Sequence, residues 1–123
     1  MYKLVIFDMD GTLLDTREGM ANAYMFGCEK MGIAENDPKA VYEYVGINTS
    51  IIYKERHGLE GDDFIKAVEI YHNYYEEKGM KELQAYPGIE QLLGDMKQAG
   101  IQLAIATARG IGQTTEMLDI GGI

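Results

Sequence analysis

The sequence predicts an α/β protein in which a small parallel sheet is interrupted by a long helical insertion. Two apolar segments, residues 4–7 and 101–106, have the length and β-rich composition of fully buried strands. Nearly all of the residues between them follow helical periodicity and give little strand signal. A strand, a crossover and a second strand favour a parallel pair, so we expect these two strands to lie side by side.

Helical patterns fill the rest of the chain. Thr16 is a candidate cap at the start of the first helix, and Pro38 lies near the first position of the second. Residues 86–88, Tyr-Pro-Gly, form a turn after the insertion, which spans residues 16–83. The predicted helices cover residues 16–31, 38–45, 51–58, 62–78, 89–99 and 111–118.

The first predicted strand leads directly into two carboxylates. Asp8 and Asp10 follow the apolar run, and Gly11 and Thr12 then end the strand. Ligands of open α/β sheets bind at the carboxyl ends of the strands. Two acids one residue apart are also costly to bury without partners. We therefore expect Asp8 and Asp10 to face a polar site at this strand end.

Phosphoryl transfer through an aspartyl intermediate is a chemistry that uses such a pair of acids. A carboxylate acts as the nucleophile in covalent phosphoryl catalysis. A bound divalent cation relieves the repulsion between close acids, and Mg²⁺ suits a site with few carboxylates completed by phosphate oxygens. Gly11 permits close approach of the backbone to a phosphate. The structural alternative is a strand end with an Asx turn.

The second predicted strand ends in a hydroxyl side chain, that of Thr107. Its hydroxyl and the backbone N–H of Ala108 suit a phosphate oxygen. An ordinary turn residue is the alternative at this position. Arg109 adjoins the expected site, where it either contacts phosphate or faces solvent.

Composition excludes several classes of function. The net charge of −9 repels polyanions, so we expect no binding to nucleic acid. No apolar run approaches the roughly 20 residues of a membrane span, so we expect no membrane partner. The chain leads from Met1 straight into the strand without a basic leader, and its single cysteine, Cys28, fits a reducing compartment. We therefore expect a cytoplasmic protein.

Residues 8–16, Asp-Met-Asp-Gly-Thr-Leu-Leu-Asp-Thr, closely resemble the first motif of the haloacid dehalogenase superfamily, in its phosphoglycolate phosphatase and β-phosphoglucomutase branch. The strand that ends in Thr107 resembles the second motif of the superfamily. The resemblance covers nearly the whole chain. It implies a Rossmann-like parallel core, formed by residues 1–15 and 84–123 and incomplete in this chain, with an inserted helical cap at residues 16–83.

The resemblance also implies roles for individual residues. Asp8 would be the nucleophile and Asp10 the general acid and base, while Asp8 and the backbone carbonyl of Asp10 would bind Mg²⁺. Residues 46–50 resemble the substrate-contacting loop of the cap. The residues expected to bind the substrate are Gly11, Thr12, Asn48, Thr107 and Ala108.

The chain departs from the superfamily pattern after the second motif. The superfamily uses a later lysine and one or two later acids that complete the Mg²⁺ site. Lys97 precedes the second strand, and Asp119 lies too close to the second motif, so neither is a positional match. Two strands also make a poor sheet whose exposed apolar edge invites pairing with another chain. We therefore expect a truncated product, a fragment, or a chain completed by self-association through that edge.

The expected function is Mg²⁺-dependent hydrolysis of a small phosphate monoester, with a small phosphorylated metabolite as the partner. A phosphomutase of the β-phosphoglucomutase kind would use the same two acids and is a close alternative. A catalytically inactive remnant that binds phosphate or another chain is the alternative outside the enzymes. Dehalogenase chemistry is disfavoured, because an acid at Asp10 is expected for phosphoryl transfer in this family.

Overall fold

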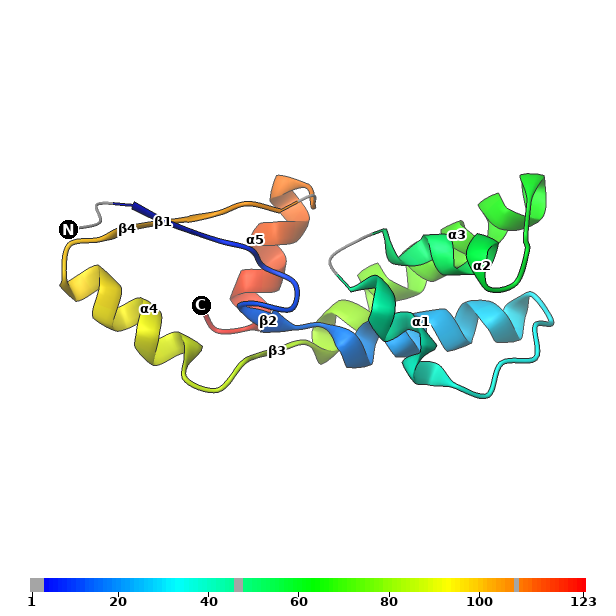
Figure 1. The fold of residues 1–123 in the computed structure, drawn as a ribbon, viewed down its shortest axis with the longest axis horizontal. Coiled ribbons are helices and arrows are strands. Elements are labelled where there is room, and N and C mark those ends of the chain that lie inside the picture. The colour runs from blue at the N-terminus through cyan, green and yellow to red at the C-terminus, as the bar shows by residue number, and fades with distance from the viewer. Residues whose placement is uncertain (1–3, 46–47, 108) are drawn as a thin grey trace. The chain divides into compact units, whose positions relative to one another are not determined.

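The computed structural model describes residues 4–45, 48–107 and 109–123 of the 123-residue chain. It has two compact units, which Figure 1 shows as ribbons. The core unit consists of Met1–Asp15 and Leu83–Ile123, and the helical unit consists of Thr16–Glu82. The core unit holds a small parallel sheet with flanking helices, which confirms the predicted α/β class.

The sheet of the core unit pairs the two predicted strands. β1 (Leu4–Phe7) runs parallel to β4 (Gln102–Ile105), with Leu4 opposite Gln102 and Phe7 opposite Ile105 (Figure 1). The backbone N–H of Ala106 donates to the carbonyl of Phe7 at 2.8 Å, which extends the pairing to the strand ends. α4 (Ile89–Gln98) precedes β4 and packs against it, and α5 (Ile111–Ile120) follows. The parallel crossover is therefore confirmed.

The expectation that residues 4–7 are fully buried is wrong. The side chains alternate along β1, because Leu4 and Ile6 are 49% and 61% exposed while Val5 and Phe7 are half-buried. This alternation is that of a strand with one covered face, whereas strands covered on both faces carry buried residues throughout. β1 is therefore more apolar than its burial among the described residues requires.

A second, antiparallel pair, which the sequence did not predict, joins the residues directly before the insertion to those directly after it. β2 (Leu14–Asp15) pairs with β3 (Gln84–Ala85), with Leu14 opposite Ala85. Leu14 is fully buried, and the backbone N–H of Tyr86 donates to the carbonyl of Leu13 at 3.1 Å. These bonds join the end of the loop after β1 to residues 84–86, so they constrain the backbone that carries the acids.

The helical unit contains no strand among its described residues. The helix predicted over residues 38–45 is a 3-10 helix whose start is capped by Asp37, which accepts from the backbone N–H of Lys39 at 3.0 Å. The core of the helical unit contains buried tyrosines, among them Tyr24, Tyr53 and Tyr71. The helical elements are α1 (Arg17–Lys30), 3-10 helices at Pro38–Tyr44 and Thr49–Ile51, α2 (Ile52–Glu55), α3 (Gly61–Glu77) and a 3-10 turn at Gly79–Glu82.

No helix in the described parts of the chain has the length and apolar character needed to cross a membrane.

Glu35 joins three segments of the helical unit. Its carboxylate accepts from the Tyr24 hydroxyl of α1 at 2.5 Å and from the Arg56 Nε after α2 at 2.6 Å. The backbone N–H of Asp37 donates to the same carboxylate at 3.1 Å, and His57 lies 3.3 Å away. The side chain is only 5% exposed. The hydrogen bonds from Arg56, followed by that from Tyr24, lower the pKa of Glu35 from 4.5 to about 2.

We expect Glu35→Gln to lower the free energy of unfolding by about 2 kcal/mol at pH 7, because the charged acceptor is lost. A carboxyl with a depressed folded-state pKa stabilises the fold above its unfolded pKa and loses that contribution as the pH falls. The difference between wild type and variant is therefore present at pH 7 and shrinks between about pH 4.5 and pH 2. Denaturant unfolding at pH 7 and pH 3 measures both effects.

Glu55→Gln is the matched control, because Glu55 is an exposed acid that accepts from the Tyr44 hydroxyl at 2.9 Å. We expect it to leave stability nearly unchanged. A loss of stability in Glu35→Gln that is the same at pH 3 as at pH 7 would argue against an ionised Glu35 in the fold.

Candidate active site

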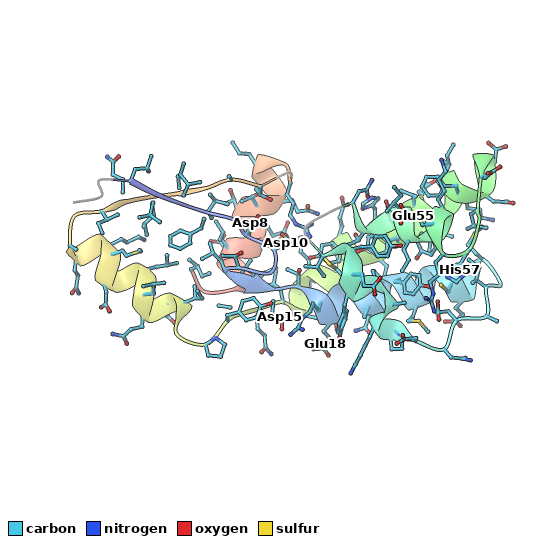
Figure 2. All side chains as sticks on the ribbon, viewed as in Figure 1. Asp8, Asp10, Asp15, Glu18, Glu55 and His57 are labelled. Carbon is cyan, nitrogen blue, oxygen red and sulfur yellow. The ribbon has the colours of Figure 1, made fainter. Side chains whose placement is uncertain are left out.

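The two acids of the first motif lie at the carboxyl end of β1. Asp8 follows Phe7 directly, and Figure 2 shows Asp8 and Asp10 at this end of the strand. Asp8 is exposed, and its Oδ1 accepts from the backbone N–H of Met9 at 2.9 Å. The Asp10 side chain is only 8% exposed. The two neighbouring acids therefore have different surroundings, one open to solvent and one enclosed.

Both acids belong to a tight loop that follows β1. The carbonyl of Met9, which is fully buried, accepts from the backbone N–H groups of Thr12, Leu13 and Leu14 at 3.0–3.2 Å. Gly11 has a φ of 79°, a conformation that side-chain-bearing residues rarely adopt, and its N–H donates to the carbonyl of Leu14 at 2.9 Å. Gly11 and Thr12 are exposed at the tip of the loop. The loop thus closes tightly after β1, and the backbone N–H groups of Gly11 and Thr12 are both used within it.

Thr107 follows the end of β4 by two residues and is half-buried. Because Phe7 is opposite Ile105 in a parallel pair, Asp8 and Thr107 lie at the same edge of the sheet. The Thr107 Oγ1 accepts from the backbone N–H of Arg109 at 3.3 Å. Ala108, the other expected phosphate contact of this segment, lies outside the described residues.

Arg109 binds Asp10 through two parallel hydrogen bonds. Its Nε lies 2.9 Å from Asp10 Oδ1 and its Nη2 lies 2.6 Å from Asp10 Oδ2. The Nη1 of Arg109 donates to Gln113 Oε1 of α5 at 2.9 Å. The Arg109 side chain is 18% exposed. This bidentate geometry is the strong form of an arginine–carboxylate pair.

The sequence predicts either a phosphate contact or solvent exposure for Arg109, whereas in the structure its guanidinium pairs with Asp10. The requirement that a buried carboxylate has a partner was the available signal. It points to a cation near Asp10 but does not say which one, since 99 residues separate the two side chains in the chain.

Asn48 belongs to the helical unit, where it directly precedes the 3-10 helix Thr49–Ile51. Its Oδ1 accepts from the Ser50 hydroxyl at 2.7 Å, and the Thr49 hydroxyl pairs with the Tyr71 hydroxyl at 2.8 Å. Thr49 and Ser50 are buried, whereas Asn48 is exposed. Gly46 and Ile47, which begin the loop expected to contact substrate, lie outside the described residues. Of the described part of that loop, Asn48 is the residue accessible to a ligand.

The donors at the end of β1 fit a magnesium ion in kind. Asp8 offers an exposed carboxylate, and the backbone at Asp10 adds a carbonyl oxygen. Mg²⁺ takes oxygen ligands, binds one or two carboxylates and keeps several waters or phosphate oxygens. No group of three or more His, Cys, Asp or Glu side chains that could hold a metal occurs in the residues that the structure describes. The fit is therefore that of a sparsely liganded ion and not that of an all-protein cage.

A parallel sheet that presents an acid pair and a threonine at one carboxyl edge defines an α/β protein with a ligand site at its strand ends. Comparison with known proteins makes this class specific. The model of the haloacid dehalogenase-like hydrolase family matches residues 5–123, and the chain belongs to that family.

Relatives of known structure or curated description are similar over most of the chain. A 5'-nucleotidase of Pseudomonas aeruginosa is 29% identical over 88% of this chain and 49% of its own. A phosphoglycolate phosphatase of Nitrosospira multiformis is 30% identical over 94% of this chain and 54% of its own. The crystal structure of a predicted phosphatase from Clostridium acetobutylicum superposes with a TM-score of 0.84 at 30% identity, covering 97% of this chain and 55% of that one. The chain thus spans about half the length of the curated relatives it matches.

Proposed function

We propose that the protein is a Mg²⁺-dependent phosphatase that hydrolyses a small phosphate monoester through an aspartyl-phosphate intermediate. The observation that carries the proposal is the placement of Asp8, exposed and directly after β1, at the same sheet edge as Thr107. Membership of the hydrolase family supports it. The names of two relatives, phosphoglycolate phosphatase and 5'-nucleotidase, also describe the removal of phosphate from small molecules.

In the proposed reaction an oxygen of the Asp8 carboxylate attacks phosphorus, and the bond from phosphorus to the ester oxygen breaks. Asp10, protonated and released from the pairing with Arg109 that it has in this structure, gives a proton to the leaving oxygen, so that an alcohol departs. Asp10 then takes a proton from a water molecule that attacks the aspartyl phosphate, which releases inorganic phosphate and restores the Asp8 carboxylate. The position of Asp10, two residues after Asp8 on the same loop, suits it to serve both steps.

Asp8 and the backbone carbonyl of Asp10 are the proposed ligands of Mg²⁺. Bound there, the ion would offset the negative charge of the acids and of the phosphoryl group. Thr107 and Ala108 are proposed to hold phosphoryl oxygens. From the loop after β1 we propose the exposed Thr12 hydroxyl, and Gly11, whose lack of a side chain permits close approach of a phosphate. Hydroxyl and backbone N–H groups suit this task because both donate hydrogen bonds to an anion without adding charge.

The helical unit is proposed to act as the cap, with Asn48 contacting the leaving group. Closure of such a unit excludes water and allows the protein to select its substrate, for which we propose a small phosphorylated metabolite. The single cysteine, Cys28, is free and buried, and we propose a reducing, cytoplasmic location on this ground. The proposed partners include neither nucleic acid nor a membrane, in keeping with the net charge of −9.

A second candidate is a phosphate-binding domain that does not turn over by itself. The pairing of Asp10 with Arg109 favours it, because both oxygens of the proposed acid are already engaged. The exposed Leu4 and Ile6 of β1 also support self-association through this strand. Phosphate binding without release of phosphate from any ester, together with a dimeric molar mass in solution, is the result this candidate predicts.

We expect phosphate release from at least one member of a panel of small esters, including glycolate phosphate, a nucleoside monophosphate and a hexose phosphate. Chelation with EDTA should reduce the release to background, and added Mg²⁺ should restore it, because the acid pair needs a cation beside a phosphoryl dianion. A colorimetric phosphate assay measures the release. An isomerised hexose phosphate in place of free phosphate would indicate a mutase, and release that is unaffected by EDTA would contradict the metal-dependent proposal.

A further inference from the structure

The end of β1 concentrates negative charge in a protein that is already acidic. A single residue, Met9, separates Asp8 from Asp10 in a chain with a net charge of −9. Arg109 provides a positive charge in direct contact with one member of this pair, through the bonds of 2.6 and 2.9 Å to Asp10. Both partners are largely enclosed, at 8% exposure for Asp10 and 18% for Arg109, so solvent screens their interaction only weakly.

Arg109 is held in place by more than its bond to Asp10. Its backbone N–H donates to the Thr107 hydroxyl at 3.3 Å, and its Nη1 donates to Gln113 at 2.9 Å. These contacts fix the residue at both ends of its side chain. The guanidinium is therefore built into the strand ends, and it orients the Asp10 carboxylate through a planar fork that matches both oxygens.

We propose that Arg109 is a built-in counter-cation of the acid pair, which positions Asp10 and lowers the affinity of this strand end for divalent cations. The identity of the cation, Mg²⁺, rests on the proposed function. The affinity of a carboxylate site for a cation rises with its net negative charge. Arg109 cancels one of the two charges, so the strand end binds Mg²⁺ more weakly than two acids alone would.

Titration calorimetry with MgCl₂ at fixed pH, without substrate, measures this effect. Arg109→Met keeps much of the side-chain length and removes the charge, and we expect it to bind Mg²⁺ about tenfold more tightly than wild type, the order of one unit charge at a protein site. Arg109→Lys keeps the charge and should stay within about threefold of wild type. Lys97→Met, at an exposed position on α4, changes the net charge equally and should leave the affinity unchanged.

A second readout needs no metal. Arg109→Met leaves the enclosed Asp10 without its guanidinium partner, so we expect the melting temperature to fall by about 5–10 °C. Adding Asp10→Asn should recover most of that fall, because the carboxylate charge that lost its guanidinium partner is then removed. The double variant also shows whether the single variant failed for lack of a partner or for a general loss of fold.

The outcomes separate this proposal from the proposed function. Wild-type protein that binds Mg²⁺, with Arg109→Met no tighter, would overturn the role of Arg109 and leave the phosphatase proposal standing. Tighter binding of Mg²⁺ by Arg109→Met than by wild type would support the counter-cation role of Arg109, even if no ester is hydrolysed. If no protein of the series binds Mg²⁺, the metal-dependent function fails. The counter-cation role is then also overturned. Recovery of the melting temperature by Asp10→Asn would in that case show only that Arg109 and Asp10 stabilise each other.

Discussion

Asp8→Asn is expected to reduce the rate of phosphate release by at least about a thousandfold, because an amide oxygen cannot serve as the attacking nucleophile. The replacement has nearly the same shape as the carboxylate. The Asp8 side chain is exposed, and the bond that its Oδ1 accepts from the backbone N–H of Met9 can also be accepted by an amide oxygen. The fold should therefore survive, and the loss of turnover should appear without a loss of stability. The phosphate assay with the preferred ester measures the effect.

Asp119→Asn is the matched control for this variant. Asp119 is an exposed acid of α5, so its replacement changes the net charge by the same amount away from the strand ends. We expect it to retain the wild-type rate. An Asp8→Asn protein that keeps more than about a tenth of wild-type turnover would show that Asp8 is not the nucleophile.

Gly19→Ala is expected to destabilise the helical unit by about 3 kcal/mol or more. Gly19 lies in the first turn of α1, where it packs directly on the backbone of Gly79. A Cβ added at Gly19 would stand 2.0 Å from the carbonyl oxygen of Gly79 and 2.7 Å from its carbonyl carbon. Backbone atoms cannot rotate away, so the two segments would have to separate. Denaturant unfolding measures the loss.

Gly94→Ala tests whether the effect comes from this contact. Gly94 lies in the interior of α4, and a Cβ there would meet no atom within 4 Å. Alanine is the better helix former by about 0.5–1 kcal/mol, so this variant should be slightly more stable than wild type. Stability of Gly19→Ala equal to that of Gly94→Ala would mean that α1 and the turn at Gly79–Glu82 do not pack as described.

The part of the site that follows from local sequence and chain topology could be predicted. Asp8 and Asp10 immediately follow an apolar run, and Thr107 follows another. The crossover rule makes such strands parallel, which brings their carboxyl ends to one edge. The register Phe7–Ile105 places these residues as that reasoning requires. Nothing beyond strand signals and topology was needed for this step.

The contacts that depend on distant side chains could not be predicted in the same way. The guanidinium of Arg109 reaches Asp10 across 99 residues of sequence, and many cations could in principle neutralise a buried acid. The cluster around Glu35 poses the same problem, since Tyr24 and Arg56 converge on it from separate segments. Such pairs are fixed by packing in three dimensions, which periodicity does not report.

Burial of β1 was overestimated for a related physical reason. An apolar run shows that a strand can be buried on both faces, but burial itself depends on the neighbours that cover it. Leu4 and Ile6 of β1 are exposed in the described structure despite their apolar character. The 3-10 form of Pro38–Tyr44 could not be predicted either. The spacing of apolar residues barely distinguishes a short 3-10 helix from a short α-helix.

The formation of an acyl phosphate on Asp8 is the most direct test of the proposed function. The protein is mixed with its preferred ester and Mg²⁺, quenched in acid within the first turnovers, and digested for peptide mass measurement. We expect one added phosphoryl group on the peptide that contains Asp8, labile to hydroxylamine and absent in Asp8→Asn. Turnover with no phosphoryl group on that peptide, or with one on another residue, would contradict it.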